Sequence, residues 1–264
     1  MAKDNKNGLS AEMISHFCPH FSGSVIIKPV LPSTQTFAKQ YLADHSLVNE
    51  LVVIANQQSA GYGKQGRHFY SPADSGLYMS IVLPHKSLGE LQKNGLFTTG
   101  IGVALVNTLQ DFYPTLSFQL KWVNDVYLHN KKIAGILCEA SYQFREQSYC
   151  YIVGIGLNIN TAVFPNELKP KAGAITSAMV DRNRLVARLI TNILDVNAHY
   201  QDGRFLNQYQ QQSFLKDRHV RLKTNTGNLE GLVCGIDKHA RLIIQTPAGD
   251  FHHLSGGEVI KVYY

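Results

Sequence analysis

The sequence predicts an α+β protein in which a mixed β-sheet packed with helices precedes a small β-barrel. Apolar, β-branched runs alternate with segments of helical periodicity as far as about residue 214. Residues 219–264 then form runs of about five residues separated by Gly-, Asn- and Asp-rich turns. The 264 residues amount to about 1.8 typical domains. We therefore expect an N-terminal arm (1–24), a main domain (25–214) and a C-terminal barrel (215–264).

Each element of the main domain follows from a local pattern. Residues 1–22 are expected to form a loosely structured arm. Continuous apolar or alternating runs predict strands at 24–32, 50–57, 77–84, 118–122, 126–129, 133–140 and 148–160, the third ending at Pro84. Apolar residues at helical spacing predict helices at 36–45, 88–112 and from Asp181 to about Phe214. Ser33 or Thr34 is the expected N-cap of the first helix.

Composition narrows the classes of partner. Apolar residues make up 44% and charged residues 17% of the chain, which excludes a disordered chain and a coiled coil. The formal net charge is 25 − 19 = +6, which favours an anionic ligand. The Lys and Arg residues are not clustered as densely as in a dedicated DNA-binding protein.

Cysteine usage and the chain start suggest a cytoplasmic protein. The four cysteines are Cys18, Cys138, Cys150 and Cys234, and none has a partner at a metal-ligand spacing. Such isolated cysteines fit a reducing compartment. The first ten residues are polar and contain no signal-peptide core, and no apolar run is long enough to span a membrane. We therefore expect no membrane association and no metal bound by the protein alone.

A glycine-rich loop carries the sharpest local motif, Gly61-Tyr62-Gly63-Lys64-Gln65-Gly66-Arg67. It matches the G-x-G-x-x-G pattern, but an aromatic, β-favouring segment closed by Pro72 follows it. A dinucleotide site needs a helix there and an acidic residue about 20 positions on, and a kinase needs motifs that are missing. Two interpretations remain: an exposed hairpin turn, or a loop whose amides, with Lys64 and Arg67, bind a phosphate or carboxylate.

Three further places combine turn residues with glycines inside strands. Asn124-Asp125 and Lys131-Lys132 each fit a polar turn. Gly135 lies inside an apolar strand, where a glycine often marks a close approach to a ligand. Gly154 and Gly156 interrupt the strand that ends at Asn158, which fits either a β-bulge or a ligand site.

Taken together and in order, these segments resemble bacterial biotin protein ligases, from about residue 25 to the C-terminus. The resemblance implies a class II synthetase-like catalytic domain of the biotin/lipoate ligase type and an SH3-like C-terminal barrel. The residues that carry it are Ser33-Thr34-Gln35, Gln58-Ser59-Ala60 with the glycine loop 61–67, Ser71-Pro72, Leu77-Tyr78-Met79-Ser80, Lys121-Trp122-Val123-Asn124-Asp125, Lys132-Ile133-Ala134-Gly135-Ile136-Leu137 and Gly154-Ile155-Gly156-Leu157-Asn158.

The resemblance implies a two-step reaction with ATP and Mg²⁺. Biotin's carboxylate would form biotinyl-5′-AMP, and a lysine of a biotin carboxyl carrier protein, a component of a biotin-dependent carboxylase, would then take the biotinyl group. Cations would offset the repulsion between carboxylate and phosphate. The residues implied in catalysis are Lys64, Arg67, Asp125 and Lys132. Those implied in binding biotin or the adenylate are Ser33, Thr34, Gln35, Gln58, Gly61, Tyr62, Gly63, Lys64, Asn124, Lys132, Gly135, Gly156 and Asn158.

Three positions depart from the family pattern. The family usually has Gly-Arg-Gly-Arg at 61–64, where this chain has Tyr62 and Lys64. Lys64 keeps the charge but lacks the bidentate fork of a guanidinium, and the ring of Tyr62 could stack on adenine. Val123 replaces the usual proline. We therefore hypothesise that the chain retains its adenylate less tightly than other members.

Other functions within the same architecture are lipoate or octanoate attachment and non-catalytic biotin binding. The loop with Lys64 and Arg67 favours the biotin branch. Repressor members of the family carry an N-terminal DNA-binding module of about sixty residues, and residues 1–24 are too few for one. We therefore expect a short form without specific DNA binding. Members of this family can form homodimers by joining sheet edges, which leaves a homodimer open for this chain.

Overall fold

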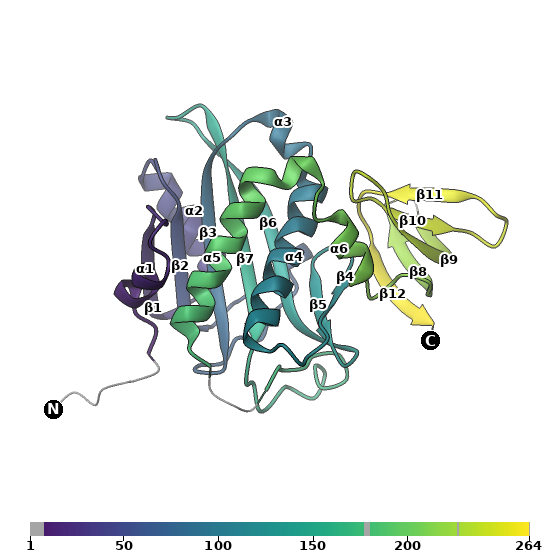
Figure 1. The fold of residues 1–264 in the computed structure, drawn as a ribbon, viewed down its shortest axis with the longest axis horizontal. Coiled ribbons are helices and arrows are strands. Elements are labelled where there is room, and N and C mark those ends of the chain that lie inside the picture. Colours follow the sequence, from purple (N-terminus) through teal and green to yellow (C-terminus); the bar gives the residue numbers. More distant parts are fainter. Residues whose placement is uncertain (1–7, 177–179, 226, 264) are drawn as a thin grey trace.

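A seven-stranded mixed sheet forms the centre of the main domain in the computed structural model, which describes residues 8–176, 180–225 and 227–263 (Figure 1). The strand order is β1-β2-β3-β7-β6-β5-β4, in which only β1 and β2 run parallel to each other. The strands are β1 (Ser24–Leu31), β2 (Leu51–Gln58), β3 (Gly76–Lys86), β4 (Gln119–Lys121), β5 (Asp125–Leu128), β6 (Lys131–Gln143) and β7 (Ser148–Asn158).

The helices divide unequally between the two faces of this sheet. Helices α4 and α5 lie side by side across one face (Figure 1), where α1 packs against α5. Helix α2 packs against β2, β3 and β7. Within the described ranges no helix is long and apolar enough to cross a bilayer. The helices are α1 (Ala11–Phe17), α2 (Thr34–Asp44), α3 (Leu88–Leu91), α4 (Asn94–Phe112), α5 (Arg182–His199) and α6 (Leu206–Gln211), with short 3₁₀ turns at Lys64–Gly66 and Tyr200–Asp202.

Alternation along β2 separates two hydrophobic cores. Val52 and Ile54 belong to the large core beneath α4 and α5, whereas Leu51 and Val53 belong to a smaller core with α2. All four are fully buried, because successive side chains of a strand point to opposite faces. The continuous apolar run of β2 is therefore the signature of a strand covered on both sides.

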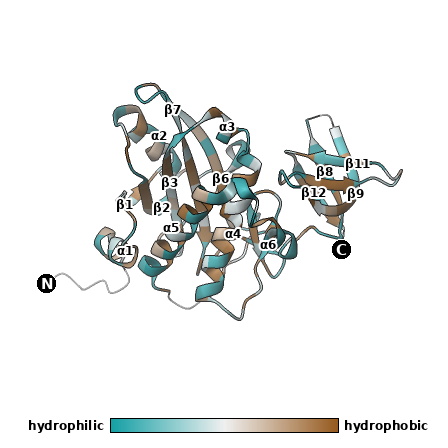
Figure 2. Cartoon of the chain, turned by 45° about the horizontal axis from the view of Figure 1, so that its top comes forward, coloured by the Kyte–Doolittle hydropathy of each residue, from teal (hydrophilic) through white to brown (hydrophobic). Residues whose placement is uncertain are grey.

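The C-terminal region forms a separate five-stranded antiparallel sheet in the order β11-β10-β9-β8-β12. This order leaves β11 and β12 at its two ends, so the sheet is barrel-like rather than continuously closed, and the expected α+β fold with an SH3-like second domain is confirmed. This sheet carries both hydrophobic and hydrophilic residues (Figure 2), and in β8 buried Val220 and Leu222 alternate with polar neighbours. Its strands are β8 (His219–Thr224), β9 (Gly227–Ile236), β10 (Leu242–Gln245), β11 (Phe251–Leu254) and β12 (Glu258–Tyr263).

Two helix starts expected from the sequence are confirmed by their caps. The Ser33 hydroxyl accepts hydrogen bonds from the backbone amides of Gln35 and Thr36 at the start of α2. The Asp181 carboxylate does the same for Asn183 and Arg184 at the start of α5. Side-chain oxygens at these positions satisfy amides that have no partner inside the helix.

The expectation of a loosely structured arm is wrong for residues 8–22. Ser10 caps α1, and the side chain of Ile14 is fully buried. Asn183 of α5 holds the segment from both sides, since its Oδ1 accepts from the Ser10 amide at 2.8 Å and its Nδ2 donates to the Gly8 carbonyl at 3.1 Å. The helix is too short to be stable alone, so contacts distant in sequence order it.

Several boundaries also differ from expectation, and the helix expected from Asp181 to about Phe214 is divided into α5, a 3₁₀ turn and α6. Strand β3 continues through Pro84 to Lys86, because the pairing register shifts between Leu83 and Lys86. At such a bulge proline's missing amide is tolerated. The helix expected at 88–112 is divided into α3 and α4, and Ser87 and Glu90 form a capping box at the start of α3.

Candidate active site

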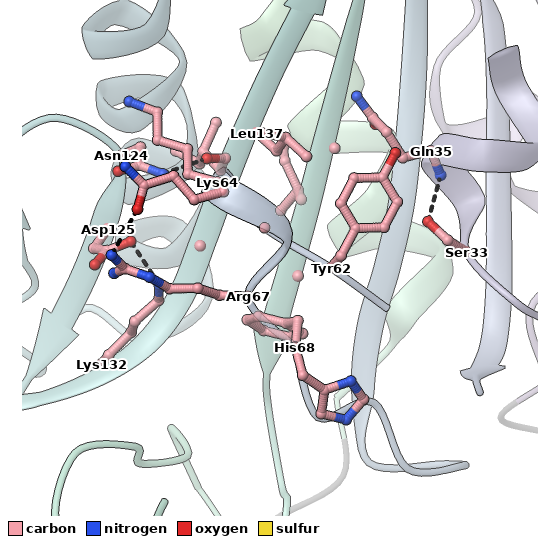
Figure 3. A pocket seen from close by; sticks show the side chains of 18 of the residues that line it. Ser33, Gln35, Tyr62, Lys64, Arg67, His68, Asn124, Asp125, Lys132 and Leu137 are labelled. Atoms are coloured by element: carbon pink, nitrogen blue, oxygen red, sulfur yellow. Dashed lines mark hydrogen bonds and ion pairs between the residues drawn. The ribbon is translucent and has the colours of Figure 1, made fainter. Parts of the chain in front are cut away.

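A pocket opens on the face of the sheet that carries α2, next to the N-terminus of that helix. Its floor is formed by β6 and β7, and the glycine loop between β2 and β3 crosses it (Figure 3). In β7, Val153, Ile155 and Leu157 belong to the core beneath α4 and α5, whereas Gly154 and Gly156 alternate with them and line the pocket. The glycines therefore fall on the face that α2 covers only in part, where the pocket lies.

Close packing by the protein's own side chains explains these glycines. A Cβ on Gly156 would lie 2.5 Å from the Phe69 ring, and one on Gly154 would lie 2.7 Å from Gln35 Oε1. A Cβ on Gly135 would lie 3.1 Å from Lys132 Nζ. The close approach that the sequence predicted at Gly135 and Gly156 therefore involves Lys132 and Phe69, which themselves line the pocket.

The start of α2 forms one polar end of the pocket. Gln58 Oε1 accepts from the backbone amide of Thr34 at 2.9 Å, and its Nε2 donates to Ser71 Oγ at 2.9 Å. Gln35, which is 3% exposed, donates from Nε2 to Glu139 at 2.8 Å and to the Ile152 carbonyl at 3.0 Å. This end therefore presents amide and hydroxyl groups that are already fixed in place.

Cations gather at the opposite end of the pocket (Figure 3), where Lys64 and Arg67 of the loop lie on the same side as Asn124, Asp125 and Lys132. Lys132 Nζ lies 2.6 Å from Asp125 Oδ1. Asn124 is fixed by two contacts with Ile136, since its Nδ2 donates to that carbonyl at 2.7 Å and its own carbonyl accepts from the Ile136 amide at 2.8 Å. The turn residues Asn124-Asp125 thus bring polar groups into the pocket.

Lys121 adds a further ammonium to this end, and its Nζ lies 3.3 Å from the Tyr127 hydroxyl. Burial lowers the pKa of Lys121, an effect that nearby Asp125 opposes and Lys132 reinforces. Desolvation also lowers the pKa of Lys64, although this residue is exposed at the open pocket, which limits the effect. Lysines that outnumber the nearby carboxylates Asp125 and Glu258 suit a site for an anion with several negative charges.

The C-terminal sheet contributes to the same pocket. Gly257, Glu258 and Val259, at the start of β12, line it, and Glu258 forms an ion pair with Arg67 of the glycine loop. Next to Lys121, the Trp122 indole donates from Nε1 to the Ala240 carbonyl of the C-terminal domain at 3.0 Å. Both domains therefore shape the cationic end.

The structure gathers all but two of the predicted site residues around this pocket. Gly61 and Asn158 are not among the lining residues. Gly61 lies in the base of the loop, where a Cβ would lie 2.7 Å from Gln58 Nε2. Asn158 is buried at the end of β7 and donates to the Gly173 carbonyl at 3.2 Å. The residues that line the pocket are Ser33, Thr34, Gln35, Gln58, Tyr62, Gly63, Lys64, Arg67, Asn124, Asp125, Lys132, Gly135 and Gly156.

Several lining residues were not selected from the sequence. Lys121 lay within a recognised block but was not assigned a role, and its position next to Trp122 at the end of a strand was the available signal. Phe69 and Leu137 resemble ordinary core residues in sequence, and Glu258 lies almost 200 residues from the loop it contacts. Only the folded chain brings these residues together.

The described residues contain no cluster of side chains that could hold a metal ion by itself, and two of the cysteines, Cys138 and Cys150, have a raised thiol pKa. Within 8–176, 180–225 and 227–263, no group of three or more His, Cys, Asp or Glu side chains is arranged to hold a metal ion. Burial raises the pKa of the Cys138 thiol to about 12 and that of Cys150 to about 11. These thiols are therefore protonated at neutral pH and behave as small apolar groups.

Comparison with protein families identifies both parts of the chain. Residues 27–158 match the biotin/lipoate A/B protein ligase family, and residues 217–262 match the biotin protein ligase C-terminal domain. The chain therefore belongs to the biotin/lipoate ligase family. Because the second match is to a domain of biotin protein ligases, the chain belongs to the biotin protein ligase branch of that family.

Relatives of known structure or curated function agree with this assignment. The chain is 30% identical over 248 residues to the bifunctional ligase/repressor BirA of Escherichia coli, a match that covers 90% of this chain and 74% of that protein. It is 27% identical over 223 residues to the biotin–[acetyl-CoA-carboxylase] ligase of Mycobacterium tuberculosis, covering 81% and 80%. The structure of the Aquifex aeolicus biotin protein ligase with biotin and ATP superimposes with a TM-score of 0.75 at 25% identity, covering 92% of this chain and 99% of that one.

Proposed function

We infer that this chain is an ATP-dependent ligase that activates biotin as biotinyl-5′-AMP and transfers the biotinyl group to a lysine of a carrier protein. One observation carries this conclusion: a polar end at α2 and a cationic end at Lys64, Lys121 and Lys132 share one pocket. The first suits an uncharged polar ring and the second suits a carboxylate and a phosphate. The pocket therefore has the two chemistries that biotin and ATP require.

In the first step a biotin carboxylate oxygen attacks the α-phosphorus of ATP and pyrophosphate leaves. Both reactants are anions, so their approach needs positive charge. Lys132 would contact both the carboxylate and the new linkage, while Lys64, Arg67 and Lys121, which line the same end of the pocket, would contact the phosphates. Such fixed charges stabilise the negative charge that develops in the transition state.

Mg²⁺ fits this site as a companion of the ATP phosphates. Mg²⁺ usually keeps several waters and binds one or two carboxylates together with substrate phosphates. Asp125 is one of two carboxylates at the cationic end, the other being Glu258, and Asn124 supplies an amide oxygen next to Asp125. We propose that Asp125 and Asn124 face the ion, which when bound would offset charge on the phosphates.

In the second step the uncharged ε-amine of a carrier lysine attacks the acyl carbon of the adenylate and AMP leaves. Asp125 would orient that amine, and Lys132 would stabilise the departing phosphate. Water must be kept out because it would hydrolyse the adenylate. The glycine loop that crosses the pocket is the element placed to exclude it. We propose that the carrier is a biotin carboxyl carrier protein or domain of a biotin-dependent carboxylase.

The polar end of the pocket, at the start of α2, would bind biotin's ureido ring. Ser33, Thr34, Gln35 and Gln58 lie there. The Ser33 hydroxyl accepts from two amides of α2 and keeps its own O–H, and Gln58 Nε2 has a second N–H besides the one it donates to Ser71. We propose that the direct polar contacts come from Ser33, Thr34 and Gln58, while Gln35 positions them. Phe69 and Leu137 provide apolar walls for the aliphatic chain.

The decisive test is transfer in a defined mixture. The protein is incubated with ATP, Mg²⁺, a biotin-acceptor carrier domain and one acid: biotin, lipoate or octanoate. We expect a single biotin to be added to the carrier, detected by mass spectrometry and abolished when the acceptor lysine is changed to arginine. Labelling by lipoate or octanoate instead would reassign the substrate, and biotin binding without transfer would indicate a non-catalytic module.

A further inference from the structure

Tyr62 of the glycine loop is held by a side chain from outside the loop. Its ring points toward Gln35 at the α2 end of the pocket, opposite the cations (Figure 3). Lys39 of α2 lies with Nζ 3.3 Å from the Tyr62 hydroxyl and 5.7 Å from the centre of its ring. The loop is thus attached to a helix through one ammonium group.

Glu139 of β6 fixes that ammonium group. Lys39 Nζ lies 2.8 Å from Glu139 Oε1, and the other carboxylate oxygen accepts from Gln35 Nε2 at 2.8 Å. The Lys39 and Glu139 side chains are 41% and 29% exposed, so this pair is partly sheltered. Partial burial opposes the charge on Lys39, but its hydrogen bonds to Glu139 and Tyr62 outweigh burial and raise its pKa. The ammonium therefore stays charged at neutral pH.

From Glu139, hydrogen bonds lead back to the other end of the same loop. Ser80 Oγ lies 2.9 Å from both Gln35 Oε1 and Thr34 Oγ1. The Thr34 amide donates to Gln58 Oε1, and Gln58 Nε2 donates to Ser71 Oγ. Ser71 Oγ in turn donates to the Phe69 carbonyl at 2.9 Å. A continuous polar path thus joins Tyr62 to Phe69 through residues of α2, β6, β3 and β2.

We propose that Lys39 is a positioning residue, which with Glu139 holds the Tyr62 ring across the biotin end of the pocket and thereby slows the escape of the bound adenylate. The proposal deepens the proposed function and rests on it. Lys39 is not among the residues that line the pocket, and Tyr62 lies at the end away from the cations that would serve the reacting atoms. Loss of the Lys39 contact should therefore change ligand retention more than chemistry.

The test compares Lys39→Met, Tyr62→Phe and the double variant in a single-turnover chase. Biotinyl-5′-AMP is formed on the enzyme, pyrophosphate is removed, and release into excess unlabelled biotin is followed. We expect each single variant to release the adenylate about fivefold faster, the size of effect associated with one hydrogen bond. The double variant should release it no faster than either one, because both changes remove the same contact.

Lys93→Met is the matched control, since Lys93 makes one exposed hydrogen bond to Gln201 far from the pocket. It should leave the release rate unchanged, and Lys39→Arg should restore part of the retention. The rate of biotin transfer from preformed adenylate to a saturating carrier should stay within about twofold in Lys39→Met and Lys93→Met, neither of which changes a residue that lines the pocket. Thermal unfolding of each variant excludes a general loss of structure, and Tyr62→Phe remains informative if Lys39→Met does not fold.

Unchanged release from Lys39→Met, or additive effects in the double variant, would overturn the proposal. So would a slower release, which would mean that the contact competes with the ligand. A wild-type chain that forms no biotinyl-5′-AMP would instead contradict the proposed function. In that case biotin affinities of the same variants, measured by calorimetry, still decide whether Lys39 acts on the pocket through Tyr62.

Discussion

The two faces of the seven-stranded sheet are built from the same strands but serve different purposes. On one face α4 and α5 cover large apolar side chains, among them Val153, Ile155 and Leu157 of β7. On the other face α2 stops short, and the intervening Gly154 and Gly156 leave room for Gln35 and Phe69 at the pocket. Stability is concentrated on the covered face, and ligand binding is concentrated where cover is missing.

This division explains why a single strand, β7, can serve both stability and ligand binding. Because side chains alternate along β7, replacing a residue on one face leaves the other face largely in place. Substitutions at neighbouring positions should therefore separate loss of stability from loss of function. The predictions below test that separation.

The largest effect is expected at the open face, for Lys132→Ala. Removing an ammonium that is placed to stabilise developing negative charge should slow biotinyl-adenylate formation by about 100-fold or more, with unchanged circular dichroism. Pyrophosphate release measures the rate. Lys131→Ala is the control, because Lys131 is exposed and donates to the Lys169 carbonyl at 2.9 Å. Equal losses in both variants would refute a specific role for Lys132.

A pair of substitutions in β7 tests the division directly. Leu157 is fully buried in the covered core, so Leu157→Ala should lower the free energy of unfolding by about 2–5 kcal/mol and leave biotin affinity nearly unchanged. Gly156→Ala would place a methyl group 2.5 Å from Phe69 and should weaken biotin binding, at a smaller stability cost of about 1–3 kcal/mol. Denaturant unfolding and calorimetry measure the two effects, and the division fails if both variants lose affinity equally.

A smaller effect is expected in the alkaline pH dependence of the open face. Burial lowers the pKa of Lys121 from 10.5, so its charge is lost at a lower pH than that of a solvated lysine. If that charge supports adenylation, activity should begin to fall before a free lysine would titrate. Lys121→Arg keeps the charge to above about pH 12 and should extend the alkaline limb of the pH–rate profile. Coincident profiles of wild type and variant would exclude Lys121 from this role.

The smallest effect is expected at the outer surface of the covering helices. Arg188 of α5 and Asp111 of α4 form an ion pair at 2.6 Å, and each side chain is 48% exposed. Solvent screening limits such a pair to about 0.5 kcal/mol, so Arg188→Ala should barely change the unfolding midpoint or the activity. A loss comparable to that of Leu157→Ala would show that the covered face depends on its surface charges as well as its core.

The sequence predicts the covered face more completely than the open one. Strand alternation and apolar runs are local signals, and they identified β2, β7 and the start of α5 before the structure was known. At the open face the glycine loop and Lys132 were recognised, but the ion pair between Lys39 and Glu139 joins residues 100 positions apart. Neither residue differs locally from an ordinary solvated charge, so no pattern along the chain could identify the pair.

The expectations for residues 8–22 and for Gly156 were incomplete for the same reason, because the residues that contact them are distant in sequence. Residues 8–22 carry apolar residues at helical spacing, Leu9, Met13, Ile14 and Phe17, after the cap Ser10, but the segment is short and the partners that order α1 lie in α5, about 170 residues away. At Gly156 the sequence fitted either a β-bulge or a ligand site, and the group nearest to it is the ring of Phe69, which lines the pocket with it. In both places the contacting residue is distant in sequence, so only the tertiary fold reveals it.

Trp122 has a practical consequence of its own. It is the only tryptophan in the chain, its side chain is buried at the pocket, and its indole nitrogen donates to the carbonyl of Ala240 in the C-terminal domain. Its intrinsic fluorescence therefore arises from a single position between the two domains. Ligand entry and any rearrangement of the domain boundary can be followed optically in the unlabelled protein, without a second emitting tryptophan to obscure the signal.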